Sequence, residues 1–408
     1  MKVYFDTKTK KWFQHETEHP FTFGKNLQPI TYKRSISDTM LPFSISASSN
    51  HVGPLIGIIV GESKNQNNFK GNGKKLRKIQ LQLAKKGHIC VVFTPSSISS
   101  THLNGFVYVE DYKKWLRVTT PLPDIVYNRI PFRSMEKRKL YQEAFEFFKK
   151  NNIPCFNPYF FSKKQVYELL AKNPLIEQHL PATSIYTNKN DLLRMLSNFP
   201  ILYAKSSSGH KGNGIYKINC LNQPFVVQTT KNTFHFSSLK KLVEFLDTHF
   251  LQEEFIIQEA IKPDNYFGKR YDLRVLVHYV RDCYRISGIG VRVSEYEDIT
   301  THVPNGGFII PYSEIQEKID ESLLHELMNN IGSTLHQGFN QLIGEFSVDL
   351  CKARNGKYYL FEVNSKPMKF DERIIEDSGI DNLTDLLIMW GRMNMQNHVD
   401  NKNLMVNK

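Results

Sequence analysis

The sequence has little cysteine and no long hydrophobic run, and each absence argues against a class of protein. Its five cysteines lie far apart in 408 residues and lack the paired spacing of a zinc site. An odd number of scattered cysteines fits a reducing compartment better than a disulfide-stabilised secreted domain. Leu55–Val60 is too short for a membrane span, and the first residues lack the apolar core of a signal peptide. We therefore expect a cytoplasmic protein without a membrane span.

The chain also lacks a long basic arm and an aromatic-interleaved nucleic-acid motif, although its formal net charge is +13. Its lysines and arginines are spread in small groups, which is typical of a solvated basic surface. The charge permits contact with nucleotides, nucleic acid, anionic lipid or an anionic wall polymer. Nucleic-acid binding is an alternative supported by net charge alone, and we expect no nucleic-acid partner.

The order of the segments predicts several domains, for which 408 residues suffice. Residues 1–52 consist of short alternating stretches and are predicted to be a β-rich segment. Strands alternate with helices in residues 53–151, which predicts a parallel, Rossmann-like sheet. Residues 152–395 form the largest unit. Residues 396–408 are polar and are predicted to be a flexible tail.

A hairpin near the C-terminus carries the clearest chemical signal. Asn355-Gly356 predicts a two-residue type I′ turn, because both residues tolerate positive φ. Counting outward from this turn places Asp349 directly opposite Glu362, with Asn364 on the same face. The other face is predicted to be core and contains Phe346, Val348, Leu350, Phe361 and Val363.

Two like charges directly opposite each other on a strand pair should destabilise the hairpin. A divalent cation between them would remove this conflict. Two carboxylates and one amide form an all-oxygen set that suits Mg²⁺, which usually takes further ligands from water and substrate phosphates. The hairpin therefore indicates a nucleotide-dependent enzyme, and the alternative is a solvated polar face on an edge hairpin.

Upstream segments supply groups that suit a nucleotide. Lys205 ends a strand and leads into a loop of small residues, through Gly212, where backbone N–H groups can approach phosphate oxygens. Asp272 and Arg274 share one strand face and suit a ribose and a phosphate, although such a pair is also a common surface ion pair. Lys164 begins a helix and could reach the same phosphates. Each feature alone is also typical of an ordinary turn or surface.

The order of these features resembles the ATP-grasp superfamily over residues 152–395. It comprises a helix lysine, a strand lysine with a Gly-rich loop, the Gln258-Glu259 hinge, an Asp-x-Arg strand, an Asn-Gly-Gly loop at 305–307 and the carboxylate hairpin. Residues 344–350 (GEFSVDL) and 361–367 (FEVNSKP) are most similar to its endospore coat-associated YheC/YheD-type branch. The implied fold is an α/β (α+β) ATP-grasp domain with two lobes clasping ATP, preceded by a Rossmann-like pre-ATP-grasp domain.

The resemblance also implies roles for individual residues. Arg274 and Asn305 would act near the γ-phosphate, and Asp272 would bind the ribose. The metal ligands would be Asp349, Glu362 and Asn364, holding one or two Mg²⁺ ions. The other ATP-binding groups would be Lys164, Lys205, Ser208, Gly209, Lys211, Gly212 and the backbone of Glu259, Ala260 and Ile261. Lys163 neighbours Lys164 and Lys211 follows Lys205, so the choice of phosphate-binding lysine stays open.

The implied activity is that of an ATP- and Mg²⁺-dependent ligase. Such an enzyme activates a small-molecule or peptide carboxylate as an acyl phosphate, which an amine or thiol then attacks. The alternative is an ATP-binding structural or assembly protein of the spore coat with little turnover. In either case the resemblance implies ATP and Mg²⁺ as cofactors, and spore coat proteins as partners.

Overall fold

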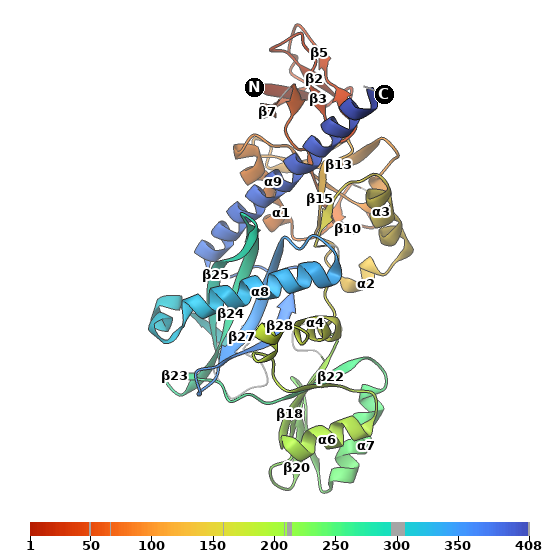
Figure 1. Cartoon of the computed structure of the whole chain (residues 1–408). Coiled ribbons are helices and arrows are strands. Elements are labelled where there is room, and N and C mark those ends of the chain that lie inside the picture. Colours follow the sequence, from red (N-terminus) through yellow and green to blue (C-terminus); the bar gives the residue numbers. More distant parts are fainter. Residues whose placement is uncertain are drawn as a thin grey trace. The chain divides into compact units, whose positions relative to one another are not determined.

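The structure is a computed structural model that describes residues 1–48, 50–65, 67–157, 159–207, 209, 214–294 and 307–406, with side chains described up to Met395 apart from Ser48. The chain forms two compact units. The first contains residues 1–159, 341–344 and 376–408, and the second contains residues 160–340 and 345–375. Each unit has its own sheets and helices (Figure 1).

The main sheet of the first unit has the order β14-β13-β12-β9-β15-β16. Its four strands β9, β12, β15 and β16 are parallel, as the alternation of strands and helices predicts. An antiparallel hairpin, which the sequence analysis did not predict, extends one edge. The strands are β9 (Ile56–Ile59), β12 (Cys90–Phe93), β13 (His102–Val109), β14 (Lys114–Pro121), β15 (Ile125–Asn128) and β16 (Cys155–Phe156), and β10 (Gly61–Glu62) pairs with β11 (Phe69–Lys70) outside this sheet.

The N-terminal segment contains short strands, as predicted. They form two four-stranded sheets, ordered β5-β2-β1-β6 and β4-β3-β8-β7. The indole of Trp12 packs between Phe5 and Phe23, at ring-centroid distances of 5.2 and 5.3 Å. The strands are β1 (Lys2–Asp6), β2 (Lys11–Gln14), β3 (Thr22–Phe23), β4 (Gln28–Pro29), β5 (Thr31–Tyr32), β6 (Met40–Ser44), β7 (Ala47–Ser48) and β8 (His51–Val52).

The helices of the first unit differ from the prediction in one place. Residues 135–150 are predicted to be one helix, but Arg138 has extended backbone angles (φ −77°, ψ 143°) and separates two helices. The helices are α1 (Gly73–Lys85), α2 (Arg133–Glu136), α3 (Lys139–Lys150) and α9 (Arg373–Val406), with a short 3₁₀ turn η1 (Pro95–Ser97). The flexibility predicted for residues 396–408 stays a prediction. In the part of the chain that the structure describes, no helix is both long and apolar enough to span a membrane.

Asp124 lies just before β15 with only 1% of its surface exposed, and it makes the stability of the protein sensitive to pH. Its Oδ2 accepts a hydrogen bond of 2.8 Å from the N–H of Leu55, and burial raises its pKa from 3.8 to about 7. Between these pH values the folded protein binds a proton that the unfolded chain has lost, so the free energy of unfolding falls as pH rises.

We expect Asp124→Asn to remove this loss, because the amide oxygen can still accept the Leu55 hydrogen bond without carrying a charge. The variant should be more stable than the wild type at pH 8 by about 4 kcal/mol and similar to it at pH 4. Urea unfolding at both pH values measures the difference. If the free energy of unfolding changed with pH in the same way for both proteins, the role given to Asp124 would be wrong.

The first lobe of the second unit is an antiparallel sheet covered on one face by α6 and α7 (Figure 1). The strand order is β17-β22-β18-β19-β20-β21. Leu202, Ala204 and Ile218 are fully buried and pack in one core with Leu242 and Leu246 of α7. The elements are β17 (Thr183–Ile185), β18 (Ile201–Ser206), β19 (Ile215–Asn219), β20 (Phe225–Gln228), β21 (Thr233–Phe236), β22 (Phe255–Glu259), α6 (Lys189–Asn198) and α7 (Leu239–Phe250).

The second lobe of this unit is built on a sheet of order β26-β25-β24-β27-β28, and β23 pairs with β24. Residues 315–335 are predicted to be one amphipathic helix, but α8 starts at Glu321. The side chain of Asp320 caps α8 by accepting from the N–H of Leu323 at 3.0 Å, while Ile315 and Ile319 are buried beside 3₁₀ turns. The elements are β23 (Asn265–Tyr266), β24 (Lys269–Val280), β25 (Cys283–Ser294), β26 (Gly307–Ile310), β27 (Glu345–Lys352), β28 (Tyr358–Asn364), α4 (Lys163–Leu170), α5 (Pro174–Glu177), α8 (Glu321–Phe339), η3 (Tyr312–Glu314) and η4 (Gln316–Lys318).

Candidate functional site

The β27–β28 hairpin brings the predicted carboxylates together. Asp349 pairs with Glu362 and Ser347 pairs with Asn364, as the sequence predicts. Both carboxylates are partly accessible, with 17% of the Asp349 side chain and 32% of the Glu362 side chain exposed. Two acidic side chains therefore lie side by side at the partly open face of the sheet.

The predicted type I′ turn is nevertheless wrong. Among the turn residues only Gly356 has positive φ (85°), whereas a type I′ turn needs it at both central positions. The N–H of Ala353 donates to Lys357 O at 2.8 Å, which closes a loop of three residues. This loop shifts the register near the turn by one residue. A β-bulge between Asp349 and Leu350 shifts it back, so the two deviations cancel at the carboxylates.

Because of the bulge, one residue that is predicted to lie in the core lies outside it. Phe346, Val348, Leu350 and Val363 are buried as predicted, but Phe361 is only partly buried. Phe361 is the extra residue of the bulge, between Leu360 and Glu362, which both have partners on β27. Its ring lies 5.3 Å from Lys205 Nζ, in cation–π contact. Phe361 therefore contributes to the candidate site and not to the core.

Two basic side chains form ion pairs with the carboxylates. Lys163 Nζ lies 3.1 Å from Glu362 Oε1 and also donates to the carbonyl oxygen of Gly209 at 2.8 Å. Arg292 Nη2 donates to Asp349 Oδ1 at 2.8 Å. Both cations are mostly buried, with side-chain exposures of 12% and 10%. Close pairs with this little exposure hold the two carboxylates in place on the sheet.

Arg292 is not among the site residues predicted from the sequence. It lies on β25 directly across from Asp272 of β24, and β24 lies between β25 and β27. Burial disfavours its charge, but Asp349, Asp272 and Glu362 together raise its pKa. The alternation Val291-Arg292-Val293 is a signal that could have identified it, because it puts one charge on the polar face of a buried strand.

Lys205 extends from β18 toward the same group of charges. Its Nζ donates to Gln258 Oε1 of β22 at 2.8 Å. Burial, helped by the charge of Lys163, lowers the pKa of Lys205 to about 8, although Glu362, Asp272 and Asp349 oppose the shift. The contact of Lys205 with Phe361 of β28, at 5.3 Å, brings this cation of the first lobe to the strand that carries Glu362.

Lys164 and the predicted adenine-binding hinge, residues 259–261, make contacts that the prediction did not include. Lys164 pairs with Glu254 at 3.0 Å, so Lys163 and not Lys164 contacts the carboxylate hairpin. The N–H of Glu259 donates to Ala182 O at 3.0 Å, and the N–H of Ala260 donates to Ile201 O at 3.1 Å. Adenine recognition by this hinge would therefore use groups other than these two N–H donors.

Asp272 and Arg274 share one face of β24, as predicted. Arg274 pairs in register with Asp349 of β27, and its guanidinium lies 5.0 Å from the Phe370 ring. The stacked ring limits the directions that the guanidinium can take. The structure therefore brings Arg274 next to the strand position of a proposed metal ligand.

Buried donors without a hydrogen-bond partner gather around these charges in the described part of the chain. They include Nε of Arg274 and of Arg292, on neighbouring strands. The hydroxyls of Ser162 and Ser207 are two more, and both lie beside Lys163, whose N–H donates to Ser207 O at 3.4 Å. A buried donor without an acceptor costs free energy. These donors therefore fit a ligand rich in anionic oxygens.

Four predicted site residues lie outside the described residues: Ser208, Lys211, Gly212 and Asn305. Their roles stay predictions. In the described segments there is no group of three or more His, Cys, Asp and Glu that could hold a metal ion. The predicted donor set of Asp349, Glu362 and the amide of Asn364 is of a different kind and stays a prediction.

The carboxylate hairpin fits Mg²⁺ by the chemistry of its donors. Asp349 and Glu362 each engage one carboxylate oxygen in the ion pairs described above, and Asn364 adds an amide oxygen on the same face. Mg²⁺ prefers oxygen ligands and is commonly held by one or two carboxylates together with substrate phosphates. The donor set therefore suits a metal that arrives with a polyphosphate.

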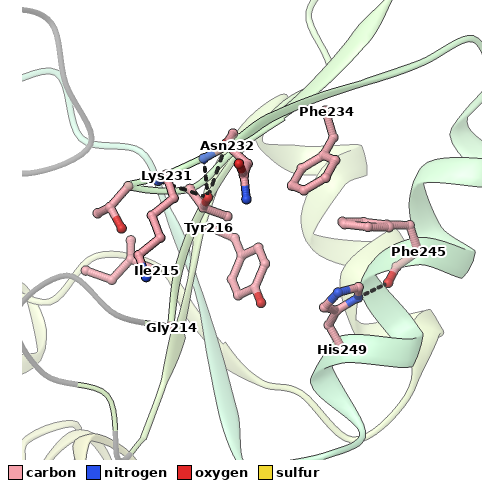
Figure 2. Close-up of a pocket in the computed structure, with 10 residues that line it drawn as sticks. Gly214, Ile215, Tyr216, Lys231, Asn232, Phe234, Phe245 and His249 are labelled. Atoms are coloured by element: carbon pink, nitrogen blue, oxygen red, sulfur yellow. Dashed lines mark hydrogen bonds between the residues drawn. The ribbon is translucent and has the colours of Figure 1, made fainter.

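A separate cavity of about 260 Å³ lies in the first lobe of this unit (Figure 2). It is lined by the aromatic rings of Tyr216, Phe234 and Phe245 and by His249, whose Nδ1 bonds to Phe245 O at 2.7 Å. None of the described residues that we predict to bind ATP or metal lines it. The cavity is therefore distinct from the site on β27 and β28.

Comparison with known proteins gives a family match over more than half of the chain. The family model of YheC/D-like ATP-grasp proteins matches residues 152–392. The endospore coat-associated protein YheD of Bacillus subtilis is 28% identical over 336 residues, which cover 78% of this chain and 73% of YheD.

Solved structures with a similar course of the chain include a synthetase and a ligase. D-alanyl-alanine synthetase A from Vibrio cholerae has a TM-score of 0.49 and 12% identity, and the match covers 83% of this chain and 99% of that chain. A RiPP-associated ATP-grasp ligase from Chryseobacterium gregarium has a TM-score of 0.45 and 16% identity, with coverages of 81% and 97%.

Proposed function

Because this chain belongs to the YheC/D-like ATP-grasp family, we propose that it is an ATP- and Mg²⁺-dependent ligase. The family supports ATP-dependent ligase activity and confirms the predicted ATP-grasp fold. In the proposed reaction a carboxylate attacks the γ-phosphate of ATP, which forms an acyl phosphate and releases ADP. An amine or thiol then displaces phosphate from it.

One observation carries this proposal. Asp349 and Glu362 lie opposite each other, and each is held by a mostly buried cation, Arg292 or Lys163. Phosphoryl transfer needs positioned charges more than a protein nucleophile. Preorganised carboxylates and cations on one partly open face are an arrangement that supports this chemistry.

The metal and the phosphates would be held by different residues of this face. Asp349, Glu362 and Asn364 would hold Mg²⁺, which when bound would neutralise charge on the phosphates. Lys163 and Lys205 would donate to phosphate oxygens, and Arg274 would do so nearest the γ-phosphate. In this assignment Lys163 replaces Lys164, because Lys163 contacts Glu362 and Gly209.

The remaining predicted residues complete the proposed nucleotide site. Asp272 would accept from the ribose hydroxyls, since it lies opposite Arg292 and beside the same charges. Ile261 and the carbonyl groups of the hinge would contact adenine. Asn305 would act near the γ-phosphate, as the resemblance implies. Arg292 would keep the Asp349 carboxylate oriented, as a positioning residue.

A second candidate function is ATP-dependent assembly in the spore coat with little turnover. The observation that favours it is the identity to YheD, which is named an endospore coat-associated protein. Under this alternative the nucleotide would stabilise a bound conformation and spore coat proteins would be the partners. A location in the cytoplasm with attachment to the coat suits either candidate.

Calorimetry followed by a turnover assay tests the proposal. We expect saturable binding of ATP in the presence of Mg²⁺ and weaker binding after chelation with EDTA. Carboxylates paired with amines or thiols should then release ADP, detected with a coupled assay. Binding without ADP release across a broad panel would favour the assembly function. Absence of binding in a folded protein would contradict both candidates.

A further inference from the structure

The hairpin that precedes Asp272 ends in an exposed phenylalanine. Tyr266 pairs with Lys269, and between them Phe267 and Gly268 have φ of 48° and 80°. Positive φ at both central residues marks a type I′ turn, which favours Asn-Gly, and a bulky side chain there is strained. Phe267 is nevertheless 88% exposed, with its ring edge-on to that of Tyr266 at a centroid distance of 4.7 Å. Turn geometry and burial therefore do not account for phenylalanine at this position.

Basic residues occur in the segments that contact this hairpin. Lys318 Nζ donates to Asn265 O at 3.4 Å, Lys352 Nζ donates to Lys318 O, and the N–H of Arg354 donates to Lys262 O at 3.4 Å. These contacts tie the β23–β24 turn to η4 and to the β27–β28 turn. We define the basic-aromatic tip as Lys262, Phe267, Lys269, Lys318, Lys352 and Arg354.

The acidic residues beside the tip do not balance its charge. Residues 262–269, 312–318 and 352–354 contain five basic side chains, which are those of the tip. The same three segments contain three carboxylates, on Asp264, Glu314 and Glu317. Asp264 accepts from the hydroxyl of Tyr271 at 3.2 Å, and Glu314 accepts from the hydroxyl of Tyr266 at 3.2 Å. The tip therefore combines a net positive charge with one protruding aromatic ring.

We propose that the basic-aromatic tip binds the surface of bilayers that contain anionic phospholipids. Phe267 inserts at the level of the headgroups, and the surrounding lysines and Arg354 contact lipid phosphates. A protruding ring at a hairpin end suits insertion into a bilayer, whereas stacking on nucleic-acid bases normally uses aromatic rings along a groove. This inference is independent of the proposed ligase reaction.

Co-sedimentation of the full chain with vesicles tests the proposal. We expect the protein to sediment with vesicles of equal parts phosphatidylcholine and phosphatidylglycerol, but not with phosphatidylcholine alone. Phe267→Asn should reduce binding roughly tenfold through loss of the inserted ring. It should keep or raise the melting temperature, because asparagine favours this turn. The double variant Lys262→Gln/Lys269→Gln should reduce binding about 30-fold.

Matched changes on α7 and at the residue after its end provide the controls. Leu251→Asn removes a side chain that is 64% exposed, and Lys240→Gln/Lys241→Gln removes two exposed charges; both should sediment like the wild type. Three outcomes would overturn the proposal: no binding to anionic vesicles, equal binding to neutral vesicles, or equal losses in tip and control variants. A tip variant that impairs an oligonucleotide gel shift but not sedimentation would instead identify a nucleic-acid surface.

Discussion

Replacing Glu362 with glutamine is expected to lower ATP turnover at least about 100-fold while the protein stays folded. Glutamine has nearly the same shape but no charge, so it weakens the proposed Mg²⁺ site at its centre. It also removes the charge that pairs with Lys163 Nζ at 3.1 Å. Steady-state ADP release at saturating Mg²⁺ measures the loss, and calorimetry with ATP should show that binding responds less to Mg²⁺ than in the wild type.

Glu326→Gln is a matched control, because Glu326 is an exposed residue of α8 in the same unit. It should retain wild-type turnover and melting temperature. If Glu362→Gln turned over ATP at the wild-type rate, Glu362 would have no part in the reaction and the proposed metal site would be wrong. If it unfolded, the loss of turnover would be uninformative, and Asn364→Ala would test the same site.

Lys163→Met should weaken ATP binding about 10- to 100-fold, whereas Lys164→Met should change it by less than about threefold. The two lysines are adjacent on α4 and the substitution is the same, so each variant controls for the other. Only 12% of the Lys163 side chain is exposed, and it joins Glu362 to the carbonyl of Gly209. Lys164 is paired with Glu254 and is 32% exposed.

Calorimetric titration with ATP and Mg²⁺ gives the two dissociation constants. Melting temperatures should confirm that both variants are folded before the affinities are compared. If Lys164→Met weakened ATP binding more than Lys163→Met, Lys164 would be the phosphate-binding lysine, as the resemblance implies. Equal and small effects would leave phosphate binding to Lys205 and to Arg274.

Much of the architecture follows from local patterns in the sequence. Apolar runs and helical periodicity predict a strand over 55–60, helices over 74–86 and 239–250 and a strand over 271–279, and β9, α1, α7 and β24 lie close to these bounds. The alternation along β27 and β28 identifies the face that carries Asp349 and Glu362. These predictions succeed because a strand has a period of two and a helix a period of 3.6, so the face of each residue is a local property.

The conformation of the β27–β28 turn is an example of what local sequence patterns do not predict. The predicted turn type is wrong, yet the predicted carboxylate pairing is confirmed, because a three-residue loop and a bulge shift the register in opposite directions. The bulge turns Phe361 from a predicted core residue into a neighbour of Lys205. A bulge depends on what packs against both faces of the sheet, and no short window of sequence contains that information.

The sequence by itself determined which residue types face the site: two carboxylates and an amide on one hairpin, and lysines on a helix and a strand upstream. Only the tertiary structure decided which lysine contacts Glu362 and that Arg292 holds Asp349. Lys163 and Glu362 are separated by almost 200 residues, and the choice between adjacent lysines depends on how α4 packs against β28. Periodicity assigns a residue to a face, whereas its partner across that face is set by packing between distant segments.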